Sequence, residues 1–95
     1  MRQKIVNADS DEGQLVGEGI VEAVENQLKD NDPPEVKNTL KRLMKIGESR
    51  ENAMRFIASV LSVEIFGVIK NNQPFNEKRY VNNLKQLPKL PFDDE

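Results

Sequence analysis

The run of residues from Ser49 to Lys70, SRENAMRFIASVLSVEIFGVIK, constrains the fold more than any other part of the chain. It is too long for one strand, while the polar residues within it, Ser59 and Glu64 among them, argue against a membrane span. At about 100° per residue its apolar side chains gather on one broad face, which predicts a central core helix. The residues of that face are Ala53, Met54, Ile57, Ala58, Val60, Leu61, Ile65, Val68 and Ile69.

Two further helices are predicted before this run. The first covers residues 14–29, where Ile20, Val21, Val24 and Leu28 share a face. Pro33 and Pro34 cannot continue it, and they also open the second helix. We expect Asp32 as the N-cap of that second helix, with Glu35 completing a capping box. Its buried stripe is expected to contain Val36, Leu40, Leu43 and Met44.

The caps near the central helix are local signals of a few residues each. Gly47 is suited to ending the second helix in the left-handed conformation, and Ser49 to capping the third. Beyond residues 71–74, which read as a turn, Asn76 is expected to cap a fourth helix over residues 77–86. Phe75 and Tyr80 are spaced for a hydrophobic staple around that cap.

These elements predict a single domain. The fold class is all-α, a bundle of four helices with a long central third helix, spanning residues 14–86. Residues 1–13 read as a flexible polar arm, and residues 87–95 as an extended, proline-containing acidic strap. A chain of 95 residues can bury one modest core.

The residue types that are missing exclude most catalytic and metal chemistry. The chain contains no Cys and no His, so it lacks thiolate nucleophiles, the commonest acid-base group and the commonest metal ligand. No glycine-rich phosphate loop is present. A calcium loop beginning at Asp9 would need glycine at its sixth position and glutamate at its twelfth, where this chain has Gln14 and Ile20. Glu22 and Glu25 could contribute to a carboxylate-bridged metal site, but without histidine they are better explained as a solvated helix face. We therefore expect no cofactor, no metal and no catalysis.

The charge is unevenly distributed. Residues 1–32 carry three basic and eight acidic side chains, whereas residues 33–95 carry eleven basic and eight acidic ones. Lys37, Lys41 and Lys45 recur at helical spacing with Arg42 beside them, and form a basic ridge that could contact nucleic-acid phosphates. A solvated face, or one neutralised by the acidic first helix, is the alternative. The polar N-terminus predicts neither a signal peptide nor a membrane anchor, so a cytoplasmic location is expected.

Glu64 projects onto the apolar face of the central helix. A buried carboxylate needs a cationic partner or a shifted pKa, and shifted carboxylates occur at active sites. The hypothesis that this chain is an enzyme rests on Glu64 alone. We favour the alternative that Arg42, Arg55 or another basic residue pairs with it, because no second titratable group marks a catalytic site.

A second apolar flank, formed by Phe56, Val63 and Phe66, lies off the main face of the central helix. Either the fourth helix covers it with Phe75 and Tyr80, or a second subunit does. This surplus of apolar surface makes protein binding or homodimerisation the favoured function, ahead of an adaptor that contacts nucleic acid.

Three segments of the chain resemble a family of short, uncharacterised bacterial helical proteins. They are VENQLKDNDPPEV (residues 24–36), GESRENAMRFIASVL (residues 47–61) and FNEKRYVNNLKQLP (residues 75–88). The resemblance implies a helical fold over most of the chain from Gly17 onward. It also implies that relatives carry two H-x-x-x-H pairs, which would make a plausible metal site on two packed helices.

This chain departs from that pattern at all four positions. Gly17 and Val21 stand where the first histidine pair would be, and Glu51 and Arg55 where the second would be. We expect core packing at the first pair and an ion pair one turn apart at the second. No metal ligand is carried over to this chain.

Overall fold

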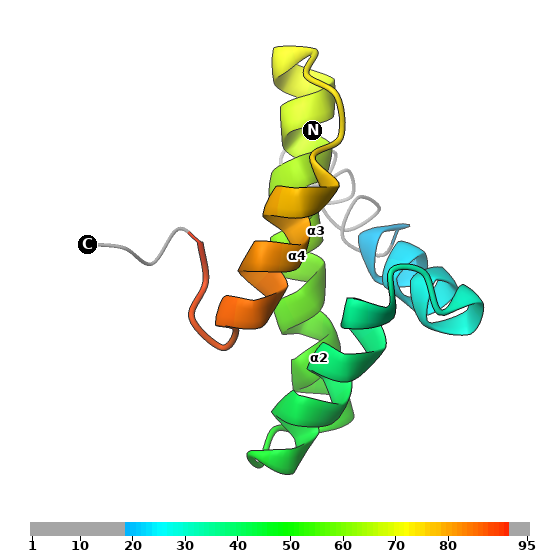
Figure 1. Cartoon of the computed structure of the whole chain (residues 1–95), viewed down its shortest axis with the longest axis vertical. Coiled ribbons are helices and arrows are strands. Elements are labelled where there is room, and N and C mark those ends of the chain that lie inside the picture. The colour runs from blue at the N-terminus through cyan, green and yellow to red at the C-terminus, as the bar shows by residue number, and fades with distance from the viewer. Residues whose placement is uncertain (1–18, 92–95) are drawn as a thin grey trace, which may run out of the picture.

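The computed structural model describes residues 19–91, and within that part the chain forms four helices and no strand (Figure 1). This confirms the all-α fold class. The helices are residues 19–30, here called the first helix, α2 (Pro34–Lys45), α3 (Arg50–Asn71) and α4 (Glu77–Gln86). The predicted arm at residues 1–13 and the end of the tail at residues 92–95 lie outside the described residues.

The helix α3 is the central element, since α2 and α4 both pack against it and against each other (Figure 1). The first helix runs into α2 through a tight turn at Asn31, whose φ is positive. The buried apolar core draws on all four helices and on the segment after α4. Its members are Ile20, Val24, Val36, Leu43, Ala53, Met54, Ile57, Ala58, Val60, Leu61, Tyr80, Leu84 and Leu87.

The connection between α2 and α3 has the two caps that the sequence predicted, at Gly47 and Ser49. Gly47 has φ 110°, and its N–H donates to the carbonyl of Met44, while the N–H of Glu48 donates to the carbonyl of Leu43. These two bonds satisfy carbonyls left free at the helix end, in the arrangement that a C-terminal glycine favours. The Oγ of Ser49 then accepts the N–H of Asn52 at 3.0 Å, as predicted for its N-cap.

The start of α2 differs from the prediction. Asp32 is not its N-cap; Pro33 is, with φ −76° and ψ 149°, and no side chain caps the helix. A residue that precedes proline is pushed out of the helical region, so Pro34 holds Pro33 extended and delays the helix by one residue. The predicted capping box is therefore wrong, although the proline pair does separate the two helices.

Some predicted core residues are exposed. Met44, which was predicted for the buried stripe of α2, is 44% exposed. Thr39, which was not predicted for that stripe, is buried. On α3, Val68 is 39% and Ile69 is 70% exposed, because the last turns of this helix extend beyond the others (Figure 1). Helical periodicity assigns residues to a face but cannot tell where along the helix its neighbours end.

The fourth helix has the predicted bounds. Asn76 caps it by accepting the N–H of Arg79, and the rings of Phe75 and Tyr80 meet edge to face at 5.9 Å, as the staple requires. After α4 the chain makes a turn rather than an extended strap, since the N–H of Lys89 donates to the carbonyl of Gln86. Leu87, in that turn, is buried in the core.

By length and hydropathy alone α3 could cross a membrane. Its most apolar window has mean hydropathy 1.5, and 33% of that window is buried among the other helices. The core helix of a water-soluble protein has the same composition, which is compatible with the soluble chain predicted from the sequence. Phe66, Val68 and Ile69 of this helix are exposed.

Candidate functional site: the outer face of α3

Glu64 is the one acidic side chain buried in the described core, and Arg79 of α4 is its partner. The carboxylate lies on the inner face of α3 and the residue is 1% exposed. Nε of Arg79 donates to one carboxylate oxygen at 2.7 Å, and Nη2 donates to the other at 2.9 Å. This bidentate pairing raises the pKa of Arg79 above its ordinary value, first through the hydrogen bond and then through the charge of Glu64.

The structure therefore answers which cation serves Glu64. It is neither Arg42 nor Arg55, the two candidates named from the sequence, but a third basic residue. Both oxygens of the carboxylate are occupied by one guanidinium, an arrangement that satisfies a buried charge and ties α4 to α3. We interpret Glu64 as a structural residue.

Arg42 does not act with the lysines of the basic ridge. Its Nη1 donates to the carbonyl of Leu87 at 2.6 Å, and its Nη2 donates to the carbonyl of Leu84 at 2.9 Å. These carbonyls end α4, where a cation is favoured by the helix dipole. Lys37, Lys41 and Lys45 are exposed, and no ion pair joins them to a carboxylate within residues 19–91.

Glu25, one of the two glutamates considered for a metal site, has a cationic partner. Glu25 pairs with Arg50 at 3.2 Å across to the start of α3, and not with Lys29 on its own helix as helical spacing suggests. Hydrogen bonding to Glu25 and its charge raise the pKa of Arg50. In the described part of the chain, no three acidic or other metal-ligating residues cluster in a way that could hold an ion.

Glu51 and Arg55, the positions where the resemblance implies a second histidine pair, lie on the solvent side of α3. Nη2 of Arg55 donates to Oε2 of Glu51 at 3.1 Å, which is the predicted ion pair one turn apart. Both side chains are more than two-thirds exposed, so the pair contributes little to stability. Val21 is half-buried, and Gly17 lies outside the described residues.

The second apolar flank is only partly covered. Phe56 and Val63 are half-buried, but Phe66 is 43% exposed and has Lys70 Nζ over its ring at 5.6 Å. Phe75 is itself 45% exposed, so α4 leaves Phe66 open to solvent. Ile69, at the edge of the face predicted for the core, is exposed in the last turns of α3 and extends this apolar surface, defined here as the outer face: Phe56, Val63, Phe66 and Ile69.

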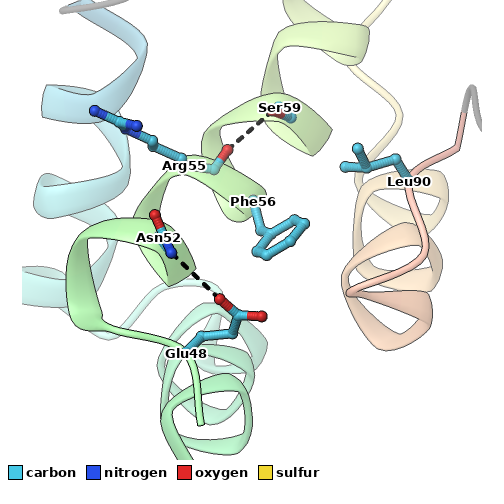
Figure 2. Close-up of a pocket in the computed structure, with 6 residues that line it drawn as sticks. All are labelled: Glu48, Asn52, Arg55, Phe56, Ser59 and Leu90. Carbon is cyan, nitrogen blue, oxygen red and sulfur yellow. Dashed lines mark hydrogen bonds between the residues drawn. The ribbon is translucent and has the colours of Figure 1, made fainter. Parts of the chain in front are cut away.

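One end of the outer face is hollowed. Figure 2 shows an open pocket of ≈ 340 Å³ in which Phe56 of α3 projects toward Leu90 of the segment after α4. The rim is polar: the amide of Asn52 donates to Glu48 at 3.4 Å, and Arg55 and Ser59 complete it. Sequence reasoning missed Leu90 because its approach to Phe56 depends on how the chain turns after α4, and no local pattern encodes that turn.

Family models, curated proteins and solved structures were compared with this chain, and none matched. The resemblance to short bacterial helical proteins stays a prediction.

Proposed function

We propose that this chain is a small, non-catalytic bacterial protein of the cytoplasm whose function is to bind protein, and that it binds a second copy of itself. The observation that carries the proposal is the outer face of α3. Phe66 is 43% exposed on a helix whose opposite face forms the core, and Ile69 is 70% exposed in the last turns of that helix. A protein of this size gains nothing in solubility from exposing such a surface, and exposed apolar patches mark binding sites.

The free energy gained by burying the outer face is small, which predicts a weak dimer. Burying the exposed parts of the four outer-face side chains on two copies contributes on the order of 8 kcal/mol, at about 1 kcal/mol for each partly exposed chain. Association costs about 4–15 kcal/mol in lost freedom, which is of the same size. The net gain is at best about 4 kcal/mol, so dissociation in the millimolar range is expected.

Light scattering on a concentration series tests the proposal. The weight-average mass should rise from monomer toward dimer as the concentration rises from micromolar to millimolar. Phe66→Ser should hold the protein at the monomer mass, whereas Phe75→Ser should not, although Phe75 is of the same type and nearly the same exposure. A monomer mass for the unaltered chain over the whole series would refute self-association.

A second candidate is an adaptor that contacts nucleic acid through Lys37, Lys41 and Lys45. The observation in its favour is that all three amines are exposed on one helix and make no ion pair with the described carboxylates. Arg42 is excluded from such a contact because α4 occupies it. Binding of a labelled duplex should weaken steeply with salt and in a triple lysine-to-alanine variant. A signal indifferent to both changes would rule this candidate out.

A further inference from the structure

We infer that the second copy packs its α3 antiparallel to this α3, with the two-fold axis beside Ser59, so that Phe66 of each copy enters the pocket between Phe56 and Leu90 of the other. This inference rests on the proposed function, since it specifies how the outer face is covered. It is drawn from side-chain size, helical register and charge along α3.

Ser59 and Ser62 make the middle of the outer face narrow. The hydroxyl of Ser59 donates to the carbonyl of Arg55 at 2.9 Å, and that of Ser62 donates to the carbonyl of Ser59 at 2.7 Å. Each hydroxyl is satisfied within its own helix, so covering it leaves no unpaired donor. Small side chains at this point allow two helices to approach closely.

The register follows from the spacing of residues around Ser59. Phe66 lies about two helical turns after Ser59, and Asn52 lies about two turns before it, so both share its face. When two such helices run antiparallel about Ser59, Phe66 of one copy lies opposite Asn52 of the other. Asn52 lines the pocket of ≈ 340 Å³ whose apolar walls are Phe56 and Leu90. The exposed ring of Phe66 in one copy therefore lies opposite the pocket of the other copy.

Charge selects the antiparallel direction. Lys70 lies about one turn after Phe66 on α3. Glu48 precedes α3 and accepts a hydrogen bond from Asn52 at the rim of the same pocket. The antiparallel pairing places Lys70 of each copy beside Glu48 of the other, giving two symmetric ion pairs. A parallel pairing would place like charges together at both ends.

Charge reversal tests the inference. Lys70→Glu and Glu48→Lys should each weaken the dimer about tenfold at low ionic strength, because each introduces two like-charge contacts. The double variant should restore the affinity of the unaltered chain. Glu48 and Lys70 lie at opposite ends of α3, whose 22 residues span about 33 Å at about 1.5 Å for each residue, so a restoring contact has to be intermolecular.

Lys78→Glu is the matched control, since it reverses an exposed lysine on α4 rather than on α3 and should leave the affinity unchanged. Circular dichroism checks that each variant is folded. If neither single reversal changes the affinity of the dimer, or if the double variant does not restore it, the antiparallel arrangement is wrong. Self-association would still stand. A chain that never dimerises would remove both proposals.

Discussion

Replacing Tyr80 by phenylalanine tests how the first helix is attached to the rest of the molecule. Tyr80 is fully buried, and its hydroxyl donates to Oε1 of Gln27 at 2.7 Å across 53 positions of the chain. Tyr80→Phe removes that hydrogen bond but keeps the ring. Since Gln27 is half-buried, the expected loss is about 1 kcal/mol of unfolding free energy. For a domain of this size that corresponds to about 4–8 °C in the melting temperature.

The same variant makes a prediction about pH. Burial raises the pKa of Tyr80, an effect only partly offset by the hydrogen bond to Gln27. The unfolded chain ionises its tyrosine near pH 10, whereas the folded chain retains the proton to higher pH. The stability due to neutral Tyr80 is therefore present below about pH 10 and lost as the pH rises above it. The loss amounts to about 1.4 kcal/mol for each pH unit until the folded pKa is reached.

Two measurements check this reasoning. The chain has one Tyr and no Trp, so its near-ultraviolet absorbance reports the ionisation of Tyr80 alone, which should be delayed in the folded protein and ordinary in denaturant. Urea unfolding should show Tyr80→Phe as the less stable protein at pH 7 and the more stable one above about pH 11. An ordinary titration in the folded state, or parallel pH curves for the two proteins, would refute the burial and the bond.

Three other substitutions have expected effects on unfolding by urea. Arg42→Ala should lower the free energy of unfolding by about 2 kcal/mol, because it leaves the carbonyls of Leu84 and Leu87 without their donor. Its control, Lys41→Ala on the exposed side of α2, should change stability by less than about 0.5 kcal/mol. Equal effects would contradict the capping of α4. Gly47→Ala should lower the free energy of unfolding by about 1 kcal/mol, because Gly47 has φ 110°. Gly19→Ala, in open space within a helix, should instead raise it by about 0.5–1 kcal/mol. Two changes of the same sign would count against this backbone argument. Ser49→Ala should cost about 1 kcal/mol and speed hydrogen exchange at the amide of Asn52; unchanged exchange there would exclude the cap.

The ion pair between Glu64 and Arg79 gives the apolar helix α3 a fixed relation to α4. A carboxylate that is fully removed from water favours the packing in which its cation is within reach and disfavours rotations of α3 that separate the two. This places Phe66 on the outside. The inner face is specified by a charge as well as by apolar packing.

The sequence by itself determined where most of the helices begin and end. Gly47, Ser49 and Asn76 act on backbone groups within four residues of themselves, so their effect can be read without knowing the fold. The periodicity of α3 likewise identified its inner face. The exception, Asp32, is also local: the restriction that Pro34 places on Pro33 outweighs the preference of an aspartate for the N-cap.

Tertiary structure alone decided which distant groups meet. Arg79 pairs with Glu64, Arg42 holds the end of α4, and Gln27 bonds Tyr80, although for each of these the sequence offers several chemically equivalent partners. It also decided that the last turns of α3 extend past their neighbours, which exposes Ile69. Charge and hydrogen-bonding capacity are properties of a residue, but distance is a property of the packed chain, and these interactions act only over a few ångströms.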